Sequence, residues 1–290
     1  MKNKNKTLPS TAILLAGFGY ALYGPLSRIV GSGGFGTTGQ ILIRTIICAI
    51  IVSLITVFTR AKLIKIKPRD YHWFVLLSLA AAGTTLFYIP AIINLPLGLT
   101  MFLFYAFGTI SSYLVGYFLF KESLNKGKVI AFILAIVGLT VMFFKSIYLT
   151  NNLYIIFACI SGFFYGLYST FSKKITNKYS LTQSVLVTTI IQLTIFLISW
   201  LIIRDNIYVY SIQSWAANIY YAIDVIVVVY LVFYGFKHIE AQIGSLLLLS
   251  ELVFIIVIGF MFYHEVPSIV QLIGGVLIVL GMIIPQFIKN

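Results

Sequence analysis

Residues 17–30 read GFGYALYGPLSRIV, and residues 162–175, which lie 145 positions later, read GFFYGLYSTFSKKI. Glycine, phenylalanine, tyrosine, leucine, tyrosine and serine recur at matching positions. A second match, at a spacing of 143, relates Gly116, Glu122 and Gly138 to Gly259, Glu265 and Gly281. Because two halves begin and end alike, we predict a duplicated chain with one repeat in residues 1–147 and the other in residues 148–290. Duplicated halves in an apolar chain are typical of secondary transporters.

The composition indicates a polytopic membrane protein. Hydrophobic residues make up 60% of the chain and charged residues only 9%, and the mean hydropathy is +1.04. A soluble domain needs roughly a quarter of its residues charged. The net charge of +13 is dispersed over short loops, so we expect no nucleic-acid binding. Cys48 and Cys159 lie inside apolar segments without metal-ligand spacing, so neither a metal nor a cofactor is predicted.

Ten apolar runs are long enough to cross a hydrocarbon core of about 30 Å as helices. They are residues 8–30, 37–59, 71–94, 98–120, 127–145, 152–172, 181–203, 214–236, 242–263 and 267–288. The predicted fold class is therefore an all-α membrane protein with five spans in each repeat. An odd number of spans makes the second repeat enter the membrane from the opposite side, which gives an inverted repeat.

The positions of lysine and arginine predict the orientation. Placing the amino terminus in the cytoplasm puts 16 of the 20 basic residues on that side, so both termini are expected to be cytoplasmic. We expect a multi-pass protein of a bacterial or archaeal-type cell (inner) membrane. The connections hold at most about a dozen residues each, which leaves no room for a separate soluble domain.

The end of the chain resembles a known family. Residues 234–282 read YGFKHIEAQIGSLLLLSELVFIIVIGFMFYHEVPSIVQLIGGVLIVLGM, which is similar to the closing hairpin of EamA-type transporters of the drug/metabolite transporter superfamily. In that family a proline usually follows the central glutamate, here Glu251, and a glycine usually precedes the turn glutamate. This chain has Leu252 and His264 instead, and Leu252 predicts a straighter ninth helix. Glu122 and Glu265 are predicted to be structural turns at the membrane interface.

The resemblance implies a carrier of a small metabolite such as an amino acid or an amine, commonly an exporter. Alternating access would move the two repeats around one site, and protons are a candidate coupling ion. The alternatives are an importer or facilitator of an organic cation or nucleoside-like solute, and a non-transporting channel or scaffold. An enzyme is not predicted, because the three histidines are scattered at span ends and no catalytic constellation is visible. The protein could be a monomer or a homodimer.

Three ionisable residues fall well inside predicted spans, where a charge costs at least about 2.5 kcal/mol and usually faces protein or water. Glu251 is the first candidate: it would bind a substrate amine or exchange a proton, or else be a buried structural carboxyl group. Asp224 and Arg44 lie at similar predicted depths, so they could form an ion pair or each contact substrate. If Arg44 neutralised Asp224, Glu251 would remain the unpaired acid and the site would favour cations or zwitterions.

Tyrosines complete the predicted site. Tyr20 and Tyr165 occupy equivalent positions in the two repeats, which suggests a symmetric cavity lining. Tyr88 and Tyr105 are further candidates. Aromatic faces attract organic cations by about 0.5–2 kcal/mol each. The alternative is that these rings only pack against other helices or face lipid.

Overall fold

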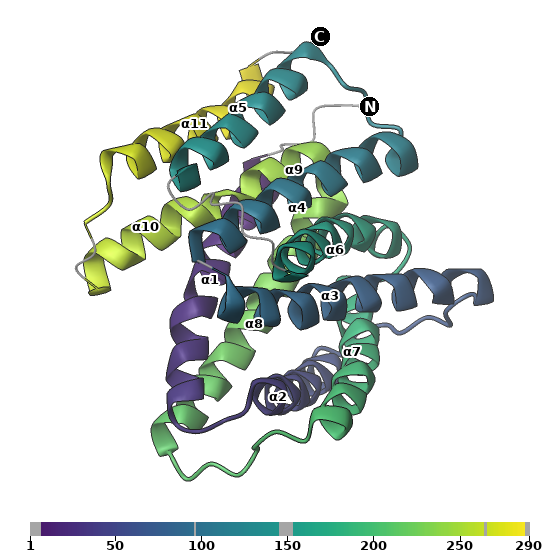
Figure 1. The fold of residues 1–290 in the computed structure, drawn as a ribbon. Coiled ribbons are helices and arrows are strands. Elements are labelled where there is room, and N and C mark those ends of the chain that lie inside the picture. The colour runs from purple at the N-terminus through teal and green to yellow at the C-terminus, as the bar shows by residue number, and fades with distance from the viewer. Residues whose placement is uncertain (1–6, 96, 145–152, 264–265, 288–290) are drawn as a thin grey trace.

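The computed structural model describes residues 7–95, 97–144, 153–263 and 266–287, and every regular element in those ranges is a helix (Figure 1). The first repeat contains α1 (Thr7–Ser32), α2 (Thr37–Phe58), α3 (Pro68–Asn94), α4 (Leu97–Phe120) and α5 (Lys126–Phe143). The second contains α6 (Leu153–Thr176), α7 (Leu181–Ile203), α8 (Ile212–His238), α9 (Ala241–Leu248), α10 (Ser250–Tyr263) and α11 (Ile269–Phe287). The predicted turn at His264 and Glu265 lies outside the described residues.

The helices have the length and hydropathy of membrane spans. Within the described residues nine helical segments are long and apolar enough to cross a bilayer, and α11 contributes a shorter apolar helix at Ile269–Pro285. Many large apolar side chains are exposed on the outer faces of these helices, for example Phe58, Phe118 and Ile202. Lipid tails solvate such surfaces and water does not, so the chain is a multi-pass membrane protein.

The ninth span, for which Leu252 predicts a straighter helix than is usual in the family, contains a local interruption. The chain leaves α9 at Leu248 and starts α10 at Ser250. Around Leu249 the backbone hydrogen bonds join residues three positions apart. The N–H of Leu249 donates to the carbonyl of Leu246 at 3.1 Å, and the carbonyl of Leu249 accepts from the N–H of Leu252 at 3.0 Å. Such an i to i+3 turn interrupts a helix without proline. The turn packs tightly against α1, where a Cβ on Gly17 would lie 2.2 Å from Ser250 Oγ.

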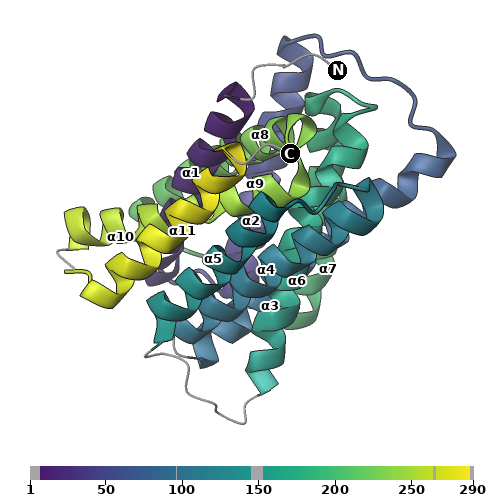
Figure 2. The ribbon, with the colours of Figure 1, turned by 90° about the horizontal axis from the view of Figure 1, so that it is seen from above.

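The helices pack in pairs that combine the two repeats. Helix α1 packs against α8, α3 against α6, α2 against α7 and α5 against α11 (Figures 1 and 2). In chain order, α1 corresponds to α6, α2 to α7, α3 to α8 and α5 to α11. Exchanging each helix for its counterpart therefore turns the α1–α8 pair into the α6–α3 pair. The same exchange maps the α2–α7 and α5–α11 pairs onto themselves. This is the pattern that a two-fold relation between the repeats predicts.

Helices α5 and α11 approach each other closely through glycine. A Cβ on Gly138 would lie 2.8 Å from the carbonyl oxygen of Gly274, and a Cβ on Gly274 would lie 2.6 Å from the carbonyl oxygen of Gly138. Small residues at a crossing let two helix backbones come together in a membrane, where no hydrophobic effect drives helices to associate. The contact between Gly138 and Gly274 has this geometry.

Connections from one repeat hold helix ends of the other at both ends of the bundle. Asp205, between α7 and α8, accepts hydrogen bonds from the N–H groups of Thr38 and Gly39 at 2.6 and 2.8 Å, and so caps the start of α2. At the other end, the side-chain amide of Gln183 in α7 donates to the carbonyl of Ile64 at 2.6 Å and accepts from its N–H at 3.2 Å.

The two ends of the helix bundle differ in charge and in the connections that they carry. The basic face is the end that carries the α2–α3, α4–α5, α6–α7 and α8–α9 connections, with Arg60, Lys62, Lys65, Lys67, Lys121, Lys126, Lys174 and Lys178. The opposite face carries the α1–α2 and α7–α8 connections.

Candidate functional site

A cavity of about 710 Å³ lies among helices of both repeats. Side chains from α1, α2, α3, α4, α6, α7, α8 and α10 line it. Six of the seven predicted site residues are among them: Glu251, Arg44, Tyr20, Tyr165, Tyr88 and Tyr105. The structure therefore brings together residues from distant parts of the sequence, and their contact with a substrate stays a prediction.

The cavity opens toward the opposite face. Its lining follows α1 as far as Arg28 and reaches the start of α2 at Thr37. Arg28 and Gly24 are both exposed, and nothing lies within 4 Å of where a Cβ on Gly24 would be. Toward the basic face, the part of α6 beyond the cavity is closely packed, since Ser172 and Thr176 are fully buried.

Glu251 stands in the first turn of α10, directly after the interruption of the ninth span. Its carboxyl group interacts with the Tyr105 hydroxyl, and Tyr20, Tyr88, Tyr165 and Tyr221 line the same cavity. The start of a helix carries free N–H groups and a partial positive charge, which favour a carboxylate there. Glu251 thus lies at a helix start among the cavity tyrosines, and it has no basic partner among the ion pairs of the described residues.

Tyrosine rings from the two repeats meet in the cavity. The rings of Tyr20 and Tyr165, equivalent in the duplication, lie edge to face with centroids 6.0 Å apart. Tyr165 also contacts Phe104 at 4.8 Å and Tyr105 at 6.4 Å between centroids. The Tyr165 hydroxyl is buried and has no hydrogen-bond partner among the described residues. A buried hydroxyl without a partner costs free energy, so a bound polar ligand that contacted it would recover part of that cost.

Arg44 faces an aromatic ring in the cavity. The Cζ atom of its guanidinium group lies 4.0 Å from the centroid of the Tyr221 ring, within the range of a cation–π contact. The described residues form three salt bridges, and none of them includes Arg44. The positive charge is therefore stabilised by an aromatic face and stays free to pair with an anionic group.

Asp224 is the predicted site residue that does not line the cavity. Its side chain points toward α1, where Oδ1 would lie 3.1 Å from a Cβ on Gly19. Its Oδ2 atom is buried without a hydrogen-bond partner among the described residues. The suggested ion pair between Arg44 and Asp224 is absent from the three salt bridges of that part of the chain. Similar depth in two spans did not imply contact, because the two side chains point in different directions.

Several polar lining residues were not singled out from the sequence: Gln40, Thr84, Thr85, Thr188, Gln192 and Tyr221. The sequence contained a feature that could have pointed to two of these residues. Gln40 has a glutamine 143 positions later, Gln183, at the spacing of the second repeat match. Tyr221 lies three positions before Asp224, close to it on the surface of a helix. The other residues have no charge or repeat that marks them among the many polar residues of the spans.

The fold and this cavity define the class of protein: a multi-pass membrane protein with a partly polar cavity between two related halves, as in secondary transporters. The model of the EamA-like transporter family matches residues 8–144 and 152–285, so the chain belongs to that family, a branch of the drug/metabolite transporter superfamily. A solved crystal structure of a protein with 15% sequence identity is similar, with a TM-score of 0.80 over 98% of each chain, which supports the fold alone. No curated protein sequence matches the chain.

Proposed function

We propose that this membrane transporter carries a small zwitterionic metabolite, such as an amino acid, and that Glu251 and Arg44 bind its two charged groups. The observation that carries the proposal is the placement of Glu251 and Arg44 in one cavity, without a salt bridge to each other or to another described residue. A purely cationic substrate would leave Arg44 unmatched, and a purely anionic one would leave Glu251 unmatched. Unpaired charges inside a membrane protein are costly, and this favours a substrate that brings one charge of each sign.

The proposed role of each cavity residue follows from the charge and hydrogen-bonding groups of its side chain. The substrate ammonium group would donate to the Glu251 carboxylate and the hydroxyls around it, while the carboxylate would accept from the Arg44 guanidinium, which suits carboxylates geometrically. Tyr20, Tyr88, Tyr105 and Tyr165 would present ring faces and hydroxyls to the rest of the molecule. Asp224 lies outside the cavity lining and is assigned no contact with the substrate.

Transport would proceed by alternating access. The described conformation is open to the opposite face, and the exchange of helix partners between the repeats supplies the symmetry for a second conformation open to the basic face. The excess of lysine and arginine on the basic face supports a cytoplasmic side there, with both termini cytoplasmic, in a bacterial or archaeal-type cell (inner) membrane. Export of the metabolite is the proposed direction, with Glu251 as the site of any proton exchange.

Thermal stabilisation of the purified protein in detergent tests the substrate class. A ligand that binds only the folded state at 100 times its Kd adds about 2.7 kcal/mol of stability. Amino acids should raise the melting temperature more than their decarboxylated amines or deaminated acids. Glu251→Gln should reduce this shift, and Asp224→Asn, which removes an intramembrane carboxylate outside the cavity, is the matched control.

Two results would contradict the proposal. One is an amino-acid shift that survives Glu251→Gln unchanged. The other is an equal loss in both variants, since this would show general destabilisation and not a lost contact in the cavity. Larger shifts with neutral nucleosides would instead support the alternative substrate class.

A further inference from the structure

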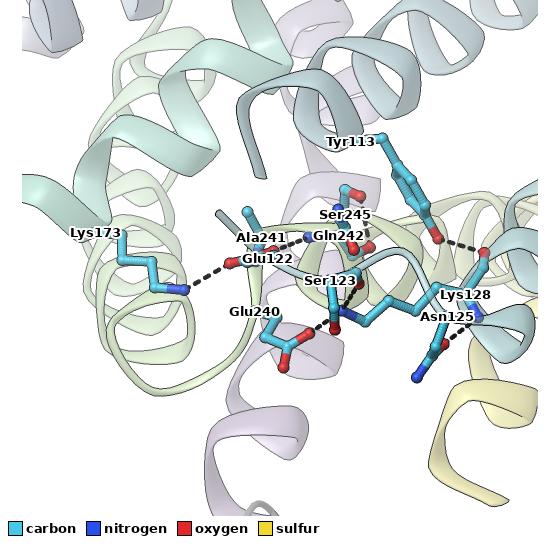
Figure 3. Close-up of polar contacts among 10 residues, drawn as sticks. All are labelled: Tyr113, Glu122, Ser123, Asn125, Lys128, Lys173, Glu240, Ala241, Gln242 and Ser245. Carbon is cyan, nitrogen blue, oxygen red and sulfur yellow. Dashed lines mark hydrogen bonds and ion pairs between the residues drawn. The ribbon is translucent and has the colours of Figure 1, made fainter. Parts of the chain in front are cut away.

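Glu122, in the connection between α4 and α5, holds the start of a helix from the other repeat. Its Oε1 accepts a hydrogen bond from the N–H of Ala241 at 2.8 Å, and its Oε2 accepts from the N–H of Gln242 at 3.2 Å (Figure 3). These are the first two N–H groups of α9. Glu122 therefore caps α9 across the boundary between the two repeats.

The cap is needed because α9 supplies none itself. The residue that precedes the helix, Glu240, makes no side-chain capping bond. The first N–H groups of any helix lack partners within the helix and carry a partial positive charge. Inside a membrane protein such groups have little access to water, so a carboxylate from elsewhere stabilises them more than it would on a soluble surface.

Local backbone geometry brings Glu122 to this position. Helix α4 ends where Lys121 adopts a left-handed conformation with φ of 52°, and the N–H of Glu122 then donates to the carbonyl of Gly116 at 2.9 Å. A Cβ on Gly116 would lie 2.8 Å from Glu122 Oε2 and 2.9 Å from Gln242 Cγ. Glycine at this position therefore leaves the space in which the carboxylate reaches α9.

A lysine from a third element completes the contact. The Nζ atom of Lys173, in α6, lies 2.8 Å from Glu122 Oε1. The side chains of Lys173 and Glu122 are only 17% and 6% exposed, so solvent screens the pair weakly. One carboxylate thus joins the α4–α5 connection of the first repeat to both α6 and α9 of the second.

A neighbouring ion pair is built differently. Lys128 forms a salt bridge with Glu240, whose side chain is 38% exposed. Lys128 is also held within its own repeat: its Nζ donates to the carbonyl of Ser123 at 2.5 Å, and its carbonyl accepts from the Tyr113 hydroxyl at 3.0 Å (Figure 3). The Lys128 side chain is only 4% exposed, but Glu240 caps no N–H group of α9, so this pair does not hold the start of the helix.

The Glu122 contact lies at the closed end of the cavity. It is on the basic face, while the cavity opens to the opposite face. Helix α9 begins at the contact and ends one residue before α10, whose first turn carries Glu251. Any conformation that opens the basic face must separate elements of the two repeats there, and the Glu122 carboxylate, from the first repeat, is bonded to α6 and α9 of the second.

We infer that Glu122, Lys173 and the first turn of α9 form a latch that keeps the basic face closed while the cavity is open to the opposite face. The latch opens when the transporter turns its cavity to the basic face. This inference rests on alternating access as part of the proposed function, and it assigns a conformational role to a residue that the sequence alone marks as a structural turn. Weakening the latch should shift the population toward the conformation open to the basic face.

Thiol accessibility of the purified protein in detergent measures that population. Ser172→Cys, in a background of Cys48→Ala and Cys159→Ala, places a thiol on α6 at a fully buried position outside the cavity lining. A water-soluble maleimide should label position 172 only when the basic face opens. Glu122→Gln should raise the labelling rate about tenfold or more, which corresponds to about 1.4 kcal/mol.

Two further variants make the result specific. Glu240→Gln, the matched control, removes the same charge beside the same helix and should change the rate less than twofold. Lys173→Gln removes the ion pair but leaves the capping bonds, so it should give an intermediate increase. It also tests the latch if Glu122→Gln does not yield folded protein.

An unchanged labelling rate in both Glu122→Gln and Lys173→Gln would overturn the inference, and so would an equal rise in Glu240→Gln. The labelling needs no substrate. A failed latch with intact amino-acid stabilisation would leave the cavity assignment standing, and loss of the stabilisation with a functioning latch would refute the zwitterion site alone.

Discussion

Replacing Arg44 by glutamine separates recognition of a carboxylate from recognition of an amine. In the described conformation the guanidinium lies 4.0 Å from the Tyr221 ring centroid and takes part in no salt bridge of the described residues. Glutamine keeps a hydrogen-bond donor at the site but removes the charge. We expect the protein to fold, because the lost cation–π contact contributes only about 0.5–2 kcal/mol.

The magnitude follows from the bond that Arg44 would form. A hydrogen bond to a charged group contributes about 1.5–3 kcal/mol, so an amino acid should bind about 10 to 150 times more weakly to Arg44→Gln than to the unmodified protein. The amine that lacks the carboxylate never formed this bond. Its Kd should therefore change less than about threefold.

The assay compares matched ligands. L-leucine, L-lysine and L-phenylalanine would each be titrated beside the corresponding decarboxylated amine, with isothermal calorimetry or thermal stabilisation as the readout. The ratio of the two Kd values cancels any general effect of the substitution on stability. Equal weakening of the amino acid and its amine would refute the assignment of Arg44 to the carboxylate.

Three further substitutions test the structure. Tyr165→Phe removes a buried hydroxyl without a described partner and should leave stability unchanged or higher, while weakening ligand binding if that hydroxyl contacts the substrate; clear destabilisation in a melting assay would show a missed partner. Gly138→Ala, whose Cβ would meet a backbone oxygen at 2.8 Å, should destabilise by about 1–3 kcal/mol, whereas Gly275→Ala, with no atom closer than 3.9 Å, should not, and equal melting temperatures would contradict the close α5–α11 contact. Asp205→Ala removes the cap of α2 and should cost about 0.5–2 kcal/mol in denaturant unfolding; no change would mean that solvent or another group replaces the cap.

Hydropathy and residue spacing predicted the membrane spans and much of the cavity lining of this chain. Each of the ten predicted spans corresponds to helix in the described residues, because runs of about twenty apolar residues have one stable form in lipid. Glu251 and five other predicted residues line the cavity because charges and repeated tyrosines inside spans tend to face the protein interior.

The sequence did not give the rotation of each helix about its axis. Asp224 and Arg44 lie at similar depths, but Asp224 faces Gly19 of α1 while Arg44 faces the cavity and Tyr221. Depth follows from residue number, at 1.5 Å per residue, whereas direction depends on which neighbours a helix packs against. The interruption at Leu249 was missed for a related reason: it occurs where Ser250 meets Gly17 of another helix, and no proline marks it.

The sequence by itself determined that this chain is a membrane protein built from two related halves, since hydropathy and repetition are properties of the chain that need no knowledge of contacts. Tertiary structure alone decided which face the cavity opens to, which acid lines it and which caps a distant helix. Glu122 and Glu251 are both acids in an apolar chain, yet one accepts bonds from α9 and the other faces a ring of tyrosines. The difference arises because a carboxylate takes its role from the groups within a few ångströms of it, and those groups come from distant parts of the chain: Ala241, which donates to Glu122, lies 119 positions away.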